Sequence, residues 1–227
     1  MNKQVDLAQI GVYSVPEASR LTKVAPARVR GWLQGYTQGA GRRSPPKLQG
    51  QLPAMDGKVA LGFLDLMEVR FISHFLQAGV QWKTLRMAAH RARSELHLDH
   101  PFAARFTTDG RAIFSETVTK TGDSRLRDLV DNQFAMFGIL EPLLQEGIEF
   151  DSRGYARLWR PSKDEPDVVL DPKRSFGRPI IDAASVPTRA LFDAFRVEGD
   201  IERVAHWHKV DPSFVREAVA FELRIAA

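Results

Sequence analysis

A short motif occurs twice in this chain, once near each end, and it constrains the fold more than any other feature. Val24-Ala25-Pro26 and Val210-Asp211-Pro212, 186 positions apart, are each followed by a Val-Arg pair at the same spacing. Proline is favoured in the first turn of a helix, because the N–H that it lacks would have no partner there. Each motif also follows a short segment with apolar residues on one side. The pattern therefore predicts a helix, a tight turn and a second helix near both ends.

In the N-terminal copy, residues 14–23 predict the first helix and residues 26–34 the second, which Gly35 ends. Ser14 is the expected N-cap, and Pro16 suits the first turn. Two short helices joined by three residues are typical of a helix-turn-helix.

The second of these helices has distinct sides when it is drawn at about 100° per residue. The apolar side, which we expect to face the core, holds Val29, Trp32, Leu33 and Tyr36. The opposite side holds Ala27, Gly31 and Gln34, with Arg28 and Arg30 on the flanks. Small residues there would allow close approach to a DNA major groove, where glutamine can pair with a base edge and arginines can bind phosphates. A plain two-helix packing unit would share the apolar side but would not need arginines on both flanks.

Positive charge is concentrated around these helices. Residues 16–50 contain seven basic residues and one acidic residue, whereas the whole chain has a net charge of only +4. A concentrated basic patch binds DNA well, because it releases several counterions together. Residues 37–58 are rich in Gly, Pro and Arg and predict a basic hairpin, or wing, followed by a strand over 59–63. For the tip of the hairpin, a disordered linker is the alternative. The expected DNA contacts are Arg20, Lys23, Arg28, Arg30, Gln34, Arg42, Arg43 and Lys47.

The remaining sequence predicts a mainly α fold with small β elements (α+β). Further helices are expected over 65–79, 80–96, 124–145, 187–199 and 200–209, with a last one after Pro212. Two hairpins are expected to turn at Asp109-Gly110 and Arg153-Gly154, with one more strand within 167–172. This gives an N-terminal winged helix-turn-helix over 1–98, a middle β-hairpin/helix region over 99–169 and a C-terminal helix-turn-helix over 170–227.

The C-terminal helix-turn-helix differs from the first in its outer face, which holds Ser213, Arg216, Glu217 and Ala220. A carboxylate on that face repels phosphate. Phe214, Phe221 and Ile225 widen the apolar side beyond what one partner helix covers. The pattern favours a protein contact or dimerisation element, with a second DNA reader and plain core packing as the alternatives.

Several functions are not expected. The chain has no cysteine, which excludes disulfides, cysteine nucleophiles and thiolate metal sites. Its start lacks the apolar segment of a secretory signal peptide, and no stretch reaches about 18 apolar residues, so we expect a cytoplasmic protein without a membrane span. The imidazoles of His97 and His100 are three residues apart, with Asp99 between them, but no third metal ligand follows at helical spacing. His206 and His208 point to different sides of a helix and so cannot bind one metal ion together. We expect no metal, no cofactor and no enzymatic activity.

Two parts of the chain resemble known modules. Tyr13-Ser14-Val15-Pro16-Glu17-Ala18, the motif from Val24 to Leu33, and Gly62–Glu68 resemble the MerR-type winged helix-turn-helix. Residues 176–181, Val186-Pro187-Thr188 and the last helix-turn-helix resemble a small domain of antitoxins that are paired with PIN-domain toxins. Together the two modules resemble the VapB-like antitoxins, which join both; the resemblance covers about residues 12–96 and 170–225 and leaves out the middle region. It departs from them at Asp182-Ala183-Ala184-Ser185, where the family usually carries a Gly-Thr-Arg loop.

This resemblance implies an antitoxin that neutralises a PIN-domain ribonuclease toxin and represses its own operon. We expect a homodimer on double-stranded operator DNA with an inverted repeat. The expected partner-binding residues are Arg189, Arg196, Phe214, Arg216 and Phe221. Two alternatives stay open: a free-standing MerR-like regulator whose middle region binds a ligand or a protein, and a protein-binding inhibitor whose DNA-reading unit is vestigial.

Overall fold

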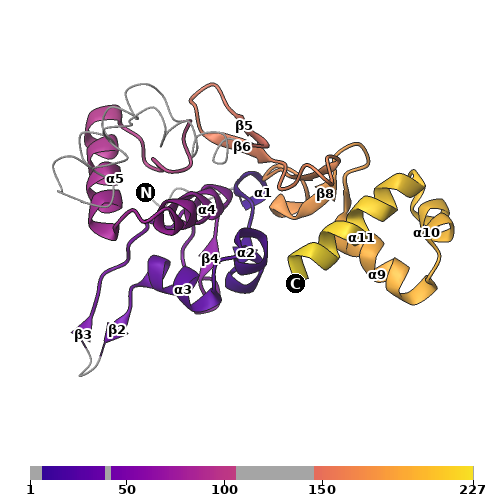
Figure 1. The fold of residues 1–227 in the computed structure, drawn as a ribbon, viewed down its shortest axis with the longest axis horizontal. Helices are drawn as coiled ribbons and strands as arrows, with labels where there is room; N and C mark the ends of the chain where they lie inside the picture. The colour runs from indigo at the N-terminus through magenta and orange to yellow at the C-terminus, as the bar shows by residue number, and fades with distance from the viewer. Residues whose placement is uncertain (1–6, 39–41, 106–145, 227) are drawn as a thin grey trace.

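A computed structural model describes residues 7–38, 42–105 and 146–226 of the chain (Figure 1). It confirms a mainly helical α+β fold with small sheets. The N-terminal part holds α1 (Leu7–Ile10), β1 (Tyr13–Ser14), α2 (Val15–Thr22), α3 (Pro26–Gln34), β2 (Thr37–Gln38), β3 (Arg42–Arg43), β4 (Ala60–Leu61), α4 (Phe63–Gln77) and α5 (Trp82–Leu96). The rest holds β5 (Ile148–Phe150), β6 (Ala156–Trp159), β7 (Val168–Leu170), the 3₁₀ turn η2 (Ser175–Gly177), β8 (Pro179–Ile181), β9 (Val186–Pro187), α9 (Thr188–Glu198), α10 (Ile201–His208) and α11 (Pro212–Ala226).

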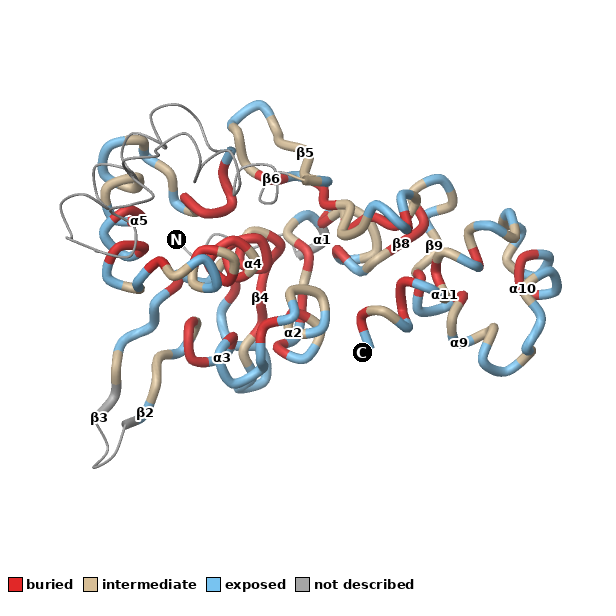
Figure 2. Tube along the Cα trace, in the orientation of Figure 1, coloured by how far each residue is buried: buried red, intermediate tan, exposed pale blue. Residues whose placement is uncertain are grey.

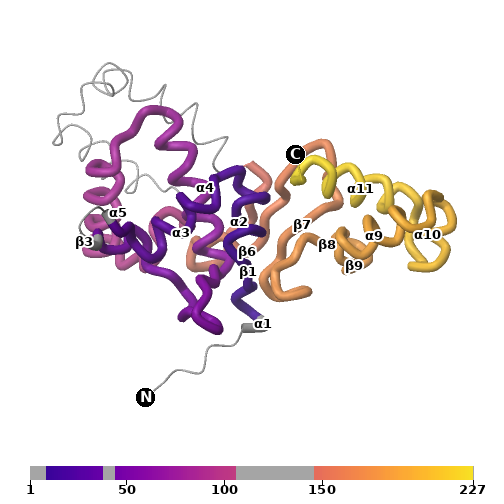
Figure 3. The backbone as a smooth tube through the Cα atoms, turned by 90° about the horizontal axis from the view of Figure 1, so that it is seen from below, coloured from indigo at the N-terminus to yellow at the C-terminus, as the bar shows by residue number. Residues whose placement is uncertain are grey.

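The molecule is elongated. Two perpendicular views place the N-terminal helices at one end and α9–α11 at the other, with the strands β5–β9 between them (Figures 1 and 3). The predicted hairpin at Asp109-Gly110 and the predicted helix over 124–145 lie outside the described residues.

The first helix-turn-helix forms where the sequence predicts it. Ser14 caps α2 through a capping box: its hydroxyl accepts a hydrogen bond from the Glu17 N–H, and the Glu17 carboxylate accepts one from the Ser14 N–H at 2.8 Å. Such a cap contributes about 1 kcal/mol to helix stability. Lys23 ends α2 in the left-handed conformation (φ 57°), and Pro26 begins α3.

The N-terminal core is built on the apolar side of α3 and on α4. Val29 is 0% exposed and Trp32 1% exposed, and the Trp32 ring meets the Trp82 ring edge-on at 5.2 Å between centroids. Most of α4 is buried in Figure 2, which makes it the central helix of this part. Strand β1 pairs with β4 in an antiparallel arrangement, and Tyr13 lies opposite Leu61.

Helix α4 begins two residues before the predicted start at residue 65. The reason is local: the Asp65 carboxylate accepts the Gly62 N–H at 2.8 Å, which makes Asp65 the third residue of the helix rather than the first. The predicted strand over 59–63 is correspondingly reduced to β4.

An antiparallel five-stranded sheet, ordered β5-β6-β7-β8-β9, occupies the centre of the molecule. The hairpin at Arg153-Gly154 and the strand within 167–172 are confirmed as β5–β6 and β7. Because the sheet spans 148–187, its strands lie on both sides of the predicted boundary after residue 169. The division into three domains stays a prediction.

The C-terminal helices confirm the second helix-turn-helix. The Asp200 carboxylate caps α10 by accepting the Arg203 N–H at 3.1 Å, and the turn 209–211 leads into α11. Val204, Val215 and Phe221 are each 0% exposed and form the core of this unit. Phe221 therefore packs the core of this unit, and its role as a partner-binding residue stays a prediction.

The two helix-turn-helix units are tied together near the start of the chain. The buried Tyr13 hydroxyl donates a hydrogen bond to the Gly177 carbonyl at 2.7 Å, and the Val12 N–H donates to the Phe176 carbonyl at 2.9 Å. Burial raises the pKa of Tyr13, which keeps its hydroxyl a neutral donor. A side chain at Gly177, which has a φ of +79°, would overlap the Tyr13 hydroxyl. The contact thus requires glycine at this position.

Candidate nucleic-acid interface

Helix α3 presents a polar outer face whose arginines form no ion pair with another described residue. Arg28, Arg30 and Gln34 are exposed, and among the described residues no carboxylate forms an ion pair with either arginine. The two guanidinium groups are thus available to phosphate, and the Gln34 amide to a base edge.

One expectation about this face is wrong. Gly31 is buried rather than outward-facing, and a Cβ there would overlap the Tyr36 ring. The absence of a side chain at Gly31 serves the packing of Tyr36 against α3 and does not open the helix to DNA. Ala27, by contrast, is exposed as expected.

A short antiparallel hairpin follows α3 and projects away from the body of the molecule (Figure 1). Its strands pair Thr37 with Arg43 and Gln38 with Arg42, and the Ser44 N–H donates to the Tyr36 carbonyl at 2.8 Å at its base. The tip, residues 39–41, and the side chains of Arg42 and Arg43 lie outside what the structure describes. The backbone nonetheless places both arginines on the predicted wing.

Lys47 lies at the base of this hairpin against two aromatic rings. Its ammonium is 4.5 Å from the Trp82 ring centroid and 5.4 Å from that of Tyr36. Partial burial, with the nearby charge of Arg86, lowers the pKa of Lys47. Cation–π contacts hold the ammonium in place while leaving the residue exposed to a phosphate.

Two exposed basic residues on α5 were not predicted from the sequence. Lys83 and Arg86 are exposed, and Arg86 lies near enough to Lys47 to shift its pKa. Their spacing of three places them on one side of α5, and this was the signal in the sequence that could have identified them. They extend the candidate surface from the base of the wing onto α5.

Two of the predicted DNA contacts lie elsewhere. The Lys23 ammonium donates to the Arg224 carbonyl at 2.8 Å, at the C-terminal end of α11. Arg20, on α2, lines a cavity of about 350 Å³ together with Arg178 and Arg189 of the C-terminal part. The structure therefore groups Arg28, Arg30 and Gln34 on α3 but turns Arg20 and Lys23 toward the C-terminal unit.

The expected partner-binding residues are split between α9 and α11. On α9, Arg189 and Arg196 lie on either side of Phe192, with guanidinium carbons 5.5 and 5.9 Å from its ring centroid. Arg189 also pairs with Asp193 at 2.8 Å. On α11, Phe214 is half-buried, and Arg216 pairs with Glu202 of α10 at 3.0 Å.

Two exposed apolar side chains near α9 and α10 were not predicted. Val197 is 89% exposed, and Trp207 is 56% exposed with the Arg203 guanidinium 5.9 Å from its ring centroid. Trp207 occupies the position in the second motif that corresponds to Leu21, which is half-buried in the first. Trp207 therefore adds exposed apolar surface to α10.

The turn at 182–185 is held by arginines. Asp182 pairs with Arg160 at 2.8 Å and with Arg174 at 2.7 Å. Burial raises the pKa of Asp182, but the hydrogen bonds and charges of these two arginines outweigh it and lower the pKa overall. The turn is thus fixed to the central sheet.

Comparisons with known proteins place the chain near one named protein. No model of a known protein family matches it. It is 27% identical over 226 aligned positions, covering 92% of this chain and 93% of the other, to the Mycobacterium tuberculosis protein named "Putative antitoxin VapB45". The crystal structure of Rv2018 from Mycobacterium tuberculosis has the same fold, with a TM-score of 0.68, 24% identity, and coverage of 91% of this chain and 96% of that one. No helix in the described residues is long and apolar enough to cross a membrane. The chain is thus a distant relative, over nearly its whole length, of a protein that carries an antitoxin name.

Proposed function

We propose that this protein is a DNA-binding antitoxin that represses its own operon and neutralises a PIN-domain ribonuclease toxin. The observation that carries the DNA part is the outer face of α3, where Arg28, Arg30 and Gln34 are exposed without a described carboxylate partner. The antitoxin part is supported by the full-length relative and its name.

In this proposal α3 enters the major groove. Gln34 reads a base edge, Arg28 and Arg30 bind phosphates on either side, and the wing with Arg42 and Arg43 reaches the neighbouring groove or backbone. The protein binds as a homodimer to an inverted repeat, because two-fold symmetric readers bind half-sites about one helical turn apart. We expect it to act in the cytoplasm.

The toxin-binding surface proposed here is the outer side of α9 and α10. Arg189, Phe192 and Arg196 supply stacked cations and an aromatic ring, and Trp207 adds exposed apolar surface. Arginine and aromatic residues dominate the binding energy of many protein interfaces. A PIN-domain active site is rich in carboxylates, so an arginine of this surface would complement it.

Two experiments test the proposal. The chain is co-expressed with the product of the neighbouring gene and purified through that product, and the upstream DNA is added to the purified chain in a gel shift. Co-purification with a small nuclease whose activity the chain blocks, together with a specific shift, supports the proposal. DNA binding without such a partner would instead indicate a free-standing regulator.

The cavity of about 350 Å³ between α2 and the C-terminal unit favours one alternative, a regulator that responds to a ligand. Its lining combines the apolar Leu21 and Ile225 with three arginines and three acidic residues, which are Arg20, Arg178, Arg189, Glu17, Asp193 and Glu222. A screen of small carboxylic acids by thermal shift separates the two functions: a stabilising ligand that also changes DNA affinity supports the regulator.

A further inference from the structure

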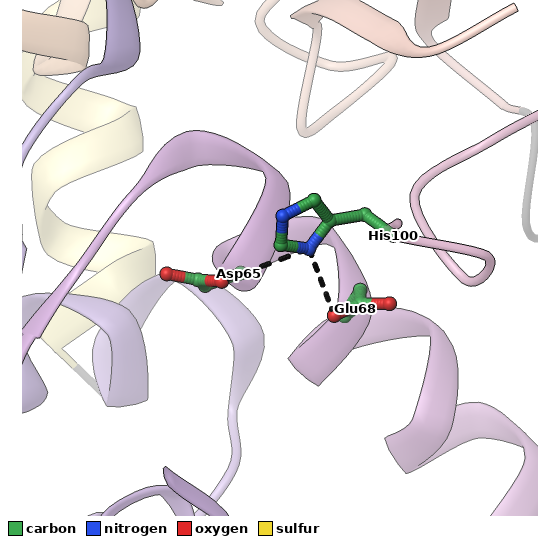
Figure 4. A group of neighbouring side chains, drawn as sticks. All are labelled: Asp65, Glu68 and His100. Atoms are coloured by element: carbon green, nitrogen blue, oxygen red, sulfur yellow. Dashed lines mark hydrogen bonds and ion pairs between the residues drawn. The ribbon is translucent and has the colours of Figure 1, made fainter. Parts of the chain in front are cut away.

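Three ionisable side chains converge at the start of α4 (Figure 4). Asp65 and Glu68 come from the first two turns of α4, and His100 comes from the segment after α5. The His100 Nδ1 is 3.3 Å from Glu68 Oε2 and 3.9 Å from Asp65 Oδ1. One atom from each residue thus lies within 4.8 Å of the other two.

Both carboxylates are held in place by backbone groups. Asp65 Oδ2 accepts the Gly62 N–H at 2.8 Å and the Gln51 N–H at 2.9 Å, and Glu68 Oε1 accepts the Phe102 N–H at 3.3 Å. The other oxygens, Asp65 Oδ1 and Glu68 Oε2, face the imidazole, and Asp65 Oδ1 also accepts the Gln51 N–H at 3.1 Å. This is the arrangement of metal ligands in proteins, in which outer hydrogen bonds orient each ligand and leave one lone pair directed at the ion.

The charge of the group also favours a cation. Asp65 and Glu68 are both 0% exposed, and within the described residues the cationic group that pairs with them is the His100 imidazole. Two carboxylates removed from water are costly unless positive charge offsets them, and one protonated imidazole offsets only one. A divalent ion would balance both carboxylates.

The group borders a cavity through His100 alone, because Asp65 and Glu68 are both fully buried and do not line it. His100 lines a cavity of about 430 Å³ together with the backbone-anchoring residue Gln51 and with Asp99 and Tyr155. An ion that binds three protein ligands needs at least one water to complete its shell, and this cavity has room for it.

We propose that Asp65, Glu68 and His100 form a binding site for a divalent transition-metal ion of the zinc or manganese kind. Imidazole nitrogen with carboxylate oxygen suits these ions, which bind such ligands at about 2.0–2.2 Å. The His100 Nδ1 is 3.3 Å from the Glu68 oxygen and 3.9 Å from the Asp65 oxygen, so small side-chain movements would let all three atoms bind one ion. The ion cross-links the start of α4 to the segment around His100 and, through Asp65, to Gln51 behind the wing.

The experiment uses untagged full-length protein that has been treated with a chelator and dialysed. Zn²⁺, Mn²⁺ and, for comparison, Mg²⁺ are titrated in by calorimetry, and the unfolding temperature is followed at each concentration. The variants are His100→Asn and Glu68→Gln. The matched control is His97→Asn, because His97 is an exposed histidine three residues away in the left-handed conformation (φ 55°), which asparagine tolerates.

The proposal predicts one Zn²⁺ per chain and an unfolding temperature that rises with metal concentration. Both variants should lose at least tenfold in Zn²⁺ affinity, whereas His97→Asn should bind as the unaltered protein does. Co²⁺ spectra of the unaltered protein, which need no variant to fold, should show nitrogen and oxygen ligands that disappear in His100→Asn. Failure of the unaltered protein to bind Zn²⁺ or Mn²⁺ overturns the proposal, as does binding that depends on His97 rather than on His100.

Discussion

Replacing Tyr13 with phenylalanine tests how the two helix-turn-helix units are held together. The change removes one hydroxyl, leaves no large cavity, and deprives the buried Gly177 carbonyl of the hydrogen bond that it accepts at 2.7 Å. An acceptor left buried without its donor costs about 1–3 kcal/mol. For a chain of this size, that corresponds to a fall in unfolding temperature of roughly 2–12 °C.

The assay is urea denaturation followed by circular dichroism, with a thermal melt as the second measurement. Tyr155→Phe is the matched control, because the Tyr155 hydroxyl accepts the Asp99 N–H at 3.0 Å in a site that water can reach. We expect that variant to change the free energy of unfolding by no more than about 0.5 kcal/mol. Equal stabilities of Tyr13→Phe and Tyr155→Phe would refute the view that the buried contact couples the units.

Three further predictions concern other parts of the fold. Gly31→Ala should lower the free energy of unfolding by about 1–3 kcal/mol in urea titration, because the added methyl overlaps the Tyr36 ring; an unchanged midpoint would contradict the packing role of Gly31. Phe221→Ala should cost about 3–5 kcal/mol in the same assay, since Phe221 is fully buried; a small cost with lost toxin binding would instead support the prediction of a partner contact. Asp182→Asn should destabilise the protein at neutral pH and cease to matter under acid, as thermal melts at several pH values can show. The pKa of Asp182 is lowered in the folded protein, so its ionised form stabilises the fold at pH values above the ordinary carboxyl pKa. This contribution is lost as the pH falls below about 4. A stability difference between variant and parent that persists in acid would contradict this.

The elements that the sequence predicts well are those with local signals. Ser14 and Glu17 form a capping box three residues apart, and Pro26 begins α3 as expected, because both effects act within a single turn. The exposure of Arg28, Arg30 and Gln34 follows from the same helical period.

The features that the sequence does not predict depend on contacts between distant residues. Gly31 is buried because Tyr36 folds back over it, and Lys23 binds the end of α11, 201 positions away, rather than remaining free for DNA. His100 lacks a ligand partner near it in the sequence and meets Glu68 only because the segment after α5 returns to α4. Helical periodicity cannot show such pairings, since it describes each helix alone.

The salt dependence of DNA binding tests the central claim most directly. The affinity of the chain for its upstream DNA is measured by fluorescence anisotropy from low to physiological salt, for the parent, for Arg28→Ala/Arg30→Ala and for the control Arg196→Ala on α9. Each phosphate contact contributes about 0.9 to the slope of log affinity against log salt, so a dimer that loses four contacts should show a slope smaller by roughly 3–4. The account predicts that reduction for the double variant and an unchanged slope for Arg196→Ala. Equal slopes for all three proteins would contradict α3 as the DNA-reading helix.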